Sequence, residues 1–144
     1  MSIPCEFNVE PVVRAPELLL GAKHYTPAVD VWSLGCIFNE LVTTKPIFEG
    51  RESKEGFQAE QLETIFKILG TPSEEDWPSM KDLEHYKQLA KFKKYPDCLE
   101  QHTDLPRDSL ELDLLKRMLC YDPSKRITAA DALKHPLFHE KPSP

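Results

Sequence analysis

The chain has 144 residues, of which 40% are hydrophobic and 29% are charged, and its net charge is −6. This length suits one ordinary domain, and the negative charge argues against a nucleic-acid-binding protein. The four cysteines have no CxxC or metal-ligand spacing, and no signal peptide or membrane-spanning apolar run is present. We therefore expect an intracellular protein with reduced cysteines that binds neither a metal, a membrane nor nucleic acid.

The first predicted element is a short turn and a single helical turn. Arg14, Ala15, Pro16 and Glu17 form a basic-proline-acidic turn, and three leucines at 18–20 follow it. Gly21 then provides a plausible helix stop, because glycine readily ends a helix.

The next segment predicts a long helix that begins at Thr26-Pro27 and ends at about Thr44. Threonine can cap the free amides, and proline favours the first helical position. Apolar side chains occupy nearly the whole circumference: Val29, Val31, Trp32, Leu34, Ile37, Phe38, Leu41 and Val42. A helix that is apolar all round is expected to be buried on all sides.

A helix with a single apolar face is predicted from about Glu60 to Leu69. Its apolar residues recur at the i, i+3, i+4 and i+7 positions 62, 65, 66 and 69, and Gly70 follows as the exit.

Three capping boxes are predicted further along the chain, at 71–74, 108–111 and 128–131. The first begins a turn that ends at Trp77-Pro78, and the second precedes the apolar residues between 110 and 119. The third opens a brief helix that His135-Pro136 ends. No stretch alternates between apolar and polar residues, so the pattern predicts an all-α fold with long loops.

Four sequence blocks carry a resemblance to a known family: RAPELLLG at 14–21, DVWSLGCIF at 30–38, ILGTPSEEDWP at 68–78, and YDPSKRIT at 121–128 with its H-P-x-F ending at 135–138. The A-P-E triplet resembles the close of the protein kinase activation segment, and D-x-W-S-x-G-C resembles the start of the central kinase helix. Both occur in kinase order and spacing. The chain is therefore similar to the cyclin-dependent kinases of the CMGC group.

Within that group the chain is most similar to the Mediator-associated class, class E in plants. The features that favour this class are the residues at 23–26, the insert at 49–60, and the prolines at 142 and 144. The resemblance implies an all-α C-terminal lobe portion of the protein kinase-like fold, without the N-terminal lobe and the catalytic loop. It also implies a divergent leader at 1–13, a partial kinase domain at 14–138 and a tail at 139–144.

Phosphoryl transfer in this family requires a glycine-rich loop, a lysine with its glutamate partner, a catalytic aspartate and magnesium ligands. The chain contains no G-x-G-x-x-G, H-R-D or D-F-G motif, and only thirteen residues precede Arg14. We therefore expect no catalytic, cofactor-binding or metal residue in this chain, whereas full-length relatives use ATP and magnesium. The family usually has T-x-W-Y-R before A-P-E, but this chain departs from it at 10–14; an alternative translation start or an incorrectly defined gene would explain the difference.

The resemblance gives structural roles to several motif residues. It implies that Glu17 and Arg126 form a buried bidentate pair, although both could instead be solvated surface charges. Asp30 matches a carboxylate that holds the catalytic loop, or it is a solvated aspartate favoured by the helix dipole. Trp32 is expected to be a core aromatic residue, and Arg14 belongs to the A-P-E turn.

A basic stretch lies between 87 and 94, where four lysines alternate with aromatic residues at 86, 92 and 95. A solvated face is the simpler interpretation, and an acidic protein partner is the alternative.

Two functions follow from these observations. In the first, the chain is part of a serine/threonine kinase whose full-length relative phosphorylates transcription-linked proteins in the nucleus, with cyclin and Mediator-type protein partners. The chain alone would be inactive. In the second, the chain is a non-enzymatic binding module or decoy for partners of the parent kinase. For the chain alone, the absent covering helix predicts an exposed apolar patch and a marginal fold.

Overall fold

The structure is a computed structural model that describes residues 14–48 and 57–139. These residues form the α-helices α1 (Pro16–Leu19), α2 (Pro27–Thr43), α3 (Ala59–Leu69), α4 (Leu99–Thr103), α5 (Leu110–Met118) and α6 (Ala129–Leu133). Three 3-10 helices complete the set, namely η2 (Pro78–Asp82), η3 (Tyr86–Lys91) and η4 (Pro136–His139). No strand occurs in these two ranges, which confirms the all-α prediction.

Several predicted segments fall outside this part of the chain. The leader at 1–13, most of the insert at 49–60, and the tail from 140 lie beyond the described residues. The predicted division into leader, partial kinase domain and tail stays a prediction.

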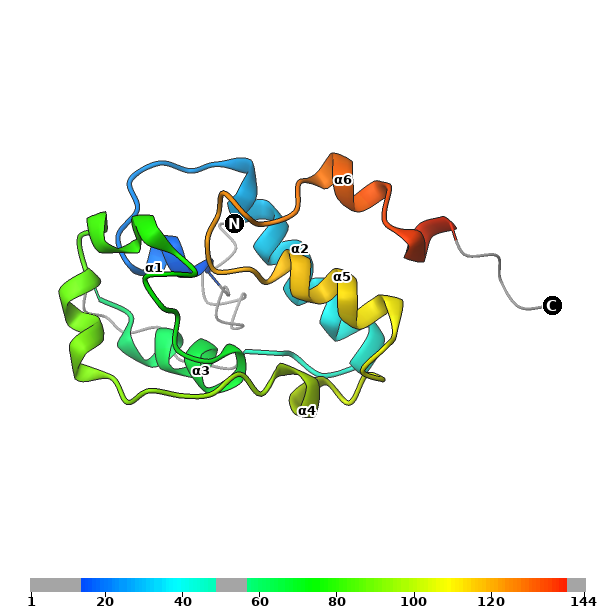
Figure 1. The fold of residues 1–144 in the computed structure, drawn as a ribbon, viewed down its shortest axis with the longest axis horizontal. Coiled ribbons are helices and arrows are strands. Elements are labelled where there is room, and N and C mark those ends of the chain that lie inside the picture. The colour runs from blue at the N-terminus through cyan, green and yellow to red at the C-terminus, as the bar shows by residue number, and fades with distance from the viewer. Residues whose placement is uncertain (1–13, 49–56, 140–144) are drawn as a thin grey trace, which may run out of the picture.

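Helices α2 and α5 pack against each other at the centre of the molecule (Figure 1). Helix α3 contacts both α1 and α4 (Figure 1). Helix η4 contacts α5, and Ala132 of α6 belongs to a small apolar cluster with Val31, Leu114 and Met118. The large side chains buried among these elements are Trp32, Phe66, Trp77, Leu62, Leu112 and Leu115. No helix among the described residues has the length and hydropathy needed to cross a membrane.

Gly35 sets the close approach of α2 to α5. A Cβ atom built at this position would lie 2.9 Å from the Cβ atom of Met118 and 3.0 Å from a methyl group of Leu119. Real Cβ atoms do not come so close, so any larger residue here would push the two helices apart.

The start of α2 differs from the prediction in one respect. Pro27 occupies the first turn as predicted, but the side chain of Thr26 makes no capping hydrogen bond, so the predicted threonine cap is wrong. Only its backbone carbonyl takes part, accepting from the Val29 N–H at 3.0 Å. The helix ends at Thr43, and the next residue, Thr44, caps it in a left-handed conformation with φ of 62°.

The expectation that α2 is buried on all sides is also wrong for this chain. Leu34, Ile37 and Leu41 have exposed fractions of 45%, 55% and 75%, respectively. Their i, i+3, i+7 spacing places them on one face, which we call the open α2 face. Val29, Val31 and Trp32 are buried on other sides of the same helix. The expected exposed apolar patch is therefore present.

The capping boxes are correct only in part. Thr128 accepts from the Asp131 N–H at 3.1 Å, as predicted. The second cap is off by one residue, because Ser109 accepts from the Leu112 N–H at 3.2 Å. The first box does not form, since the hydroxyl group of Thr71 accepts from the backbone N–H of Tyr95 at 2.8 Å.

We expect the open α2 face to bind a hydrophobic dye such as anilinonaphthalene sulfonate. The triple variant L34Q/I37Q/L41Q should lower dye fluorescence without lowering the thermal midpoint, because these side chains contribute little to the core. The buried Leu112→Ala variant is the control, and it should destabilise the chain by about 2–5 kcal/mol. A sharp melt of the parent chain with no dye binding would contradict the prediction.

Candidate functional site

The motif residues at 14–17 position Glu17 at the start of α1. Ala15 is extended, Pro16 takes the first helical position, and Glu17 follows in the first turn with an exposed fraction of only 4%. The chain leaves α1 through Gly21, whose φ of 97° favours glycine. A carboxylate is thereby fixed inside the protein at a tight turn.

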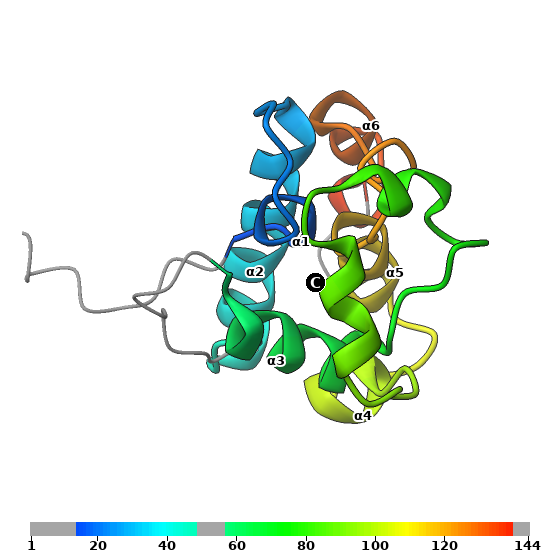
Figure 2. The same ribbon diagram turned by 90° about the vertical axis from the view of Figure 1, so that its left-hand side faces the viewer.

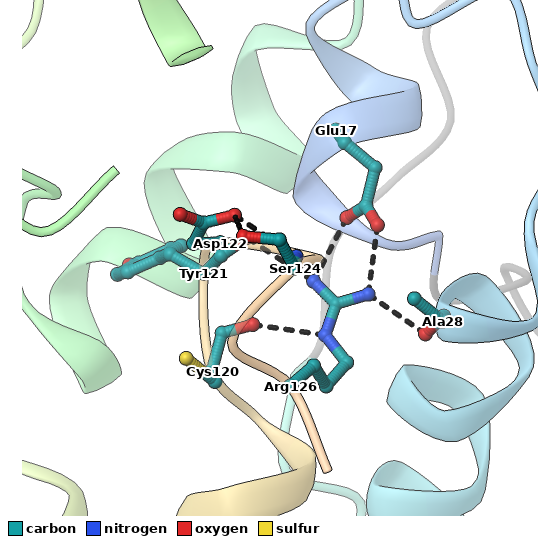
Figure 3. Close-up of polar contacts among 7 residues, drawn as sticks. All are labelled: Glu17, Ala28, Cys120, Tyr121, Asp122, Ser124 and Arg126. Carbon is teal, nitrogen blue, oxygen red and sulfur yellow. Dashed lines mark hydrogen bonds and ion pairs between the residues drawn. The ribbon is translucent and has the colours of Figure 1, made fainter. Parts of the chain in front are cut away.

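Arg126 is positioned by the turn that follows α5. The carboxylate of Asp122 accepts from the N–H of Ser124 at 2.9 Å and from its hydroxyl group at 2.8 Å. The backbone carbonyl of Asp122 accepts from the N–H groups of Lys125 and Arg126. These contacts, drawn in part in Figure 3, close the turn and direct the guanidinium inward.

The two side chains form a bidentate ion pair (Figure 3). Arg126 Nη1 lies 2.7 Å from one carboxylate oxygen of Glu17, and Nη2 lies 2.9 Å from the other. Three backbone carbonyls accept the remaining donors: Cys120 from Nε at 2.9 Å, Ala28 from Nη1 at 2.7 Å and Tyr121 from Nη2 at 3.2 Å. All five N–H donors of the guanidinium thus have acceptors, which a buried charge requires.

Trp32 covers the guanidinium. The Arg126 Cζ atom lies 5.2 Å from the centroid of the Trp32 ring, a distance typical of a cation–π contact. The indole also stacks on Phe48, with 5.6 Å between centroids and 8° between ring planes. Trp32 is fully buried, in agreement with its predicted place in the core.

Burial affects the titratable groups beside the pair. It raises the pKa of the Cys36 thiol to about 12, although the positive charge of Arg126 acts in the opposite direction. Burial likewise raises the pKa of the Tyr121 phenol well above its ordinary value, with a smaller effect from Asp97. Both groups stay neutral at physiological pH, so neither offers an activated nucleophile.

The structure does not bring Asp30 to this pair. Asp30 lies exposed in the first turn of α2, and its carboxylate makes no hydrogen bond or ion pair with the described residues. It precedes Leu34 by four residues and therefore shares the open α2 face. Arg14 is also exposed, whereas Ala15 and Pro16 are buried.

A second charged cluster lies between α5 and the C-terminal helices. The carboxylate of Asp113 accepts from Arg117 Nε at 2.9 Å and from His135 Nε2 at 2.7 Å. These hydrogen bonds, that of His135 foremost, lower the pKa of Asp113. His135 Nδ1 accepts from the Leu137 N–H at 3.2 Å, so both ring nitrogens hold the turn into η4 and none is left for chemistry.

Sequence reasoning missed the groups that complete the arginine site. The carbonyls of Ala28, Cys120 and Tyr121 carry no sequence signal, because every residue has one. The turn around Asp122 could have been found, since an aspartate followed by proline and serine is typical of such turns.

Within the described residues no group of three histidine, cysteine or acidic side chains could hold a metal ion.

The Glu17–Arg126 ion pair can join segments of the chain, but its hydrogen-bonding groups are all in use, so none is left for proton transfer. Both carboxylate oxygens of Glu17 and all donors of Arg126 are engaged and shielded from solvent. The pair connects the A-P-E turn to the loop after α5 and, through Ala28, to the start of α2. We therefore assign it a positioning role.

Replacing Glu17 with glutamine should lower the free energy of unfolding by about 3–5 kcal/mol, because the buried Arg126 charge loses its counter-ion. Urea unfolding followed by circular dichroism measures the loss. Arg126→Lys should also destabilise, since lysine cannot occupy the carbonyls of Cys120, Ala28 and Tyr121 together. The matched control is Arg107→Lys at an exposed pair with Glu100, where we expect a change below about 1 kcal/mol. If Arg126→Lys and Arg107→Lys lowered the free energy of unfolding equally, the positioning role of the Glu17–Arg126 pair would be overturned.

Comparison of the sequence with known proteins identifies relatives of this chain. The Protein kinase domain family matches residues 4–138. A probable cyclin-dependent kinase 8 of Dictyostelium discoideum is 49% identical over 135 residues, which are 91% of this chain and 36% of that protein. Cyclin-dependent kinase E-1 of Arabidopsis thaliana is 50% identical over 138 residues, which are 91% of this chain and 29% of that protein.

A serine/threonine-protein kinase of Yarrowia lipolytica is 48% identical over 137 residues, covering 90% of this chain and 34% of the relative. The chain thus spans about a third of the length of these relatives. The predicted resemblance to the cyclin-dependent kinases, including class E of plants, is confirmed. This chain belongs to the protein kinase domain family.

Proposed function

We propose that this chain forms the C-terminal part of the catalytic domain of a serine/threonine protein kinase of the cyclin-dependent type. The names of its relatives and their identity of 48–50% support the kinase type. In such a kinase the complete domain transfers the γ-phosphoryl group of ATP to a hydroxyl group of a protein. The 144 residues contain none of the motifs that hold the nucleotide, so we propose that they bind neither ATP nor magnesium alone.

The open α2 face is the observation that carries this proposal. Leu34, Ile37 and Leu41 are large apolar side chains exposed on a helix whose opposite side, with Val29 and Trp32, is buried in the core. Such a stripe on the central helix is typical of a surface that packs against another part of a domain. Asp30 continues the stripe with a carboxylate that lacks a partner among the described residues and can accept backbone N–H groups. We infer that this face receives the kinase segments that come before the A-P-E motif.

In that assembly the residues of this chain position the catalytic machinery and do not touch the reacting atoms. The Glu17–Arg126 pair would hold the end of the activation segment against the loop after α5. Asp30, at the start of α2, would hold the catalytic loop. These are the roles that the family resemblance implies for the matching residues.

The partners of the whole kinase follow by similarity. The relatives are cyclin-dependent kinases by name, which supports a cyclin partner for the complete protein. Mediator-type subunits and a nuclear location rest on the sequence resemblance alone and belong to the same proposal.

The open α2 face also favours a second function. If cells make the 144-residue product alone, an exposed apolar face would suit a binding module or decoy that captures a partner of the parent kinase. The size of the native product distinguishes the two functions. A longer protein that carries H-R-D and D-F-G supports the kinase, whereas a product of this size alone supports the module.

We expect the isolated chain to show no heat of binding with magnesium-ATP in isothermal titration calorimetry and no phosphorylation of a peptide substrate. The physical reason is that phosphate binding needs the glycine-rich loop, the lysine and the magnesium ligands together. Measurable affinity for magnesium-ATP would contradict the prediction.

A chimera tests the proposed assembly directly. The segments of the Arabidopsis kinase that precede its A-P-E motif are joined to residues 14–144 of this chain and produced with the cyclin of that kinase. We expect the chimera to phosphorylate a peptide that the isolated chain leaves unmodified. The variant L34E/I37E/L41E should abolish this activity, because three buried carboxylates would oppose docking on the open α2 face. A folded chimera without activity, or full activity in the triple variant, would overturn the proposal.

A further inference from the structure

One segment of this acidic chain carries a concentrated positive charge. Residues 87–94 contain four lysines, no arginine and no acidic residue, although the net charge of the chain is −6. The four lysines, Lys87, Lys91, Lys93 and Lys94, are all exposed. We call this set the lysine ridge.

The segment that carries the lysine ridge is held firmly by its other side chains. Phe92 packs edge-on against Phe66, with 5.4 Å between ring centroids. Tyr86 donates from its hydroxyl group to Glu74. The Tyr95 N–H donates to the hydroxyl group of Thr71, and the Tyr95 carbonyl accepts from the Thr71 N–H at 2.9 Å. The aromatic residues that alternate with the lysines thus turn toward the core and leave the ammonium groups outside.

The lysines of the ridge make no ion pair with the described residues, whereas two lysines elsewhere do. Lys67 lies 3.2 Å from a carboxylate oxygen of Glu63, and Lys116 lies 2.7 Å from one of Glu100. Across residues 14–48 and 57–139, no carboxylate lies within ion-pair distance of the ridge ammonium groups. Four like charges on one short segment repel one another, and among the described residues no carboxylate compensates them.

The lysine ridge is about as long as a short extended peptide. From Lys87 to Lys94 there are four steps of 3-10 helix and three of extended chain, which together span at most about 18 Å, since their rises are about 2.0 Å and 3.3 Å per residue. An extended peptide of about five or six residues covers that length. The end of the molecule that carries η3 faces the viewer in Figure 2, where no other described element lies in front of it.

We propose that the lysine ridge docks an acidic, extended segment of a partner protein, in which glutamate and aspartate carboxylates meet the four ammonium groups. Lysine presents a mobile point charge, which suits carboxylates spread along a chain, whereas phosphate groups are best held by the fork of arginine. Nucleic acid fits poorly, because the ridge aromatic residues are packed inward and the remaining surface is acidic. This docking surface is independent of the kinase chemistry and of the open α2 face.

The test measures fluorescence anisotropy of a labelled peptide of alternating glutamate and glycine, added to the whole 144-residue chain at low salt. We expect saturable binding that weakens as salt rises, and no binding of the same peptide with glutamine in place of glutamate. The variant K91Q/K93Q/K94Q should weaken binding about tenfold, since each exposed pair contributes modestly.

The matched control is K23Q/K45Q/K134Q, which removes the same charge from exposed lysines outside the ridge. It should retain nearly all of the affinity, and circular dichroism checks that both variants keep their helix content. Equal losses in the two variants, or no binding of the glutamate peptide, would overturn the proposal. Tighter binding of a single-stranded oligonucleotide of equal charge would also overturn it, in favour of nucleic acid.

Discussion

The ion pair between Glu17 and Arg126 is the contact on which the arrangement of the described helices most depends. It joins residues 109 positions apart, and its geometry meets the strict conditions under which a buried charge is tolerated. The guanidinium also takes up carbonyls from the start of α2 and from the loop after α5. Three separate parts of the chain therefore share one charged group, and none of them can move without leaving a buried donor or acceptor unpaired.

Local sequence signals predicted most helix positions, and tertiary contacts account for the failures. Gly70 ends α3, and Thr128 caps α6, as their motifs indicated. The hydroxyl group of Thr71 bonds instead to a residue 24 positions later, a partner that no local motif can reveal. The Glu17–Arg126 pair was expected only from the family resemblance, since two charges so distant in sequence show no periodic relation. Periodicity also could not show whether the element that covers the open α2 face is present.

Two surfaces remain without compensation within the described residues, and they differ in kind. The open α2 face is apolar and belongs to the central helix, so covering it gains hydrophobic free energy that depends little on salt. The lysine ridge is charged and lies on a short segment at one end, so its interactions weaken as salt rises. Salt concentration therefore distinguishes the two surfaces. Docking on the open α2 face should change little as salt rises, whereas binding of a partner to the lysine ridge should weaken.

The sequence separation of Glu17 and Arg126 also has a consequence for the order of folding. Contacts between distant residues form after local helices, because closing a long loop costs conformational entropy before the contact is made. At synthesis rates of about 5–20 residues per second, Arg126 leaves the ribosome roughly 5–20 s after Glu17. During that interval α1 carries a carboxylate without its partner. The A-P-E turn thus reaches its final position only after Arg126 and the loop after α5 have been synthesised.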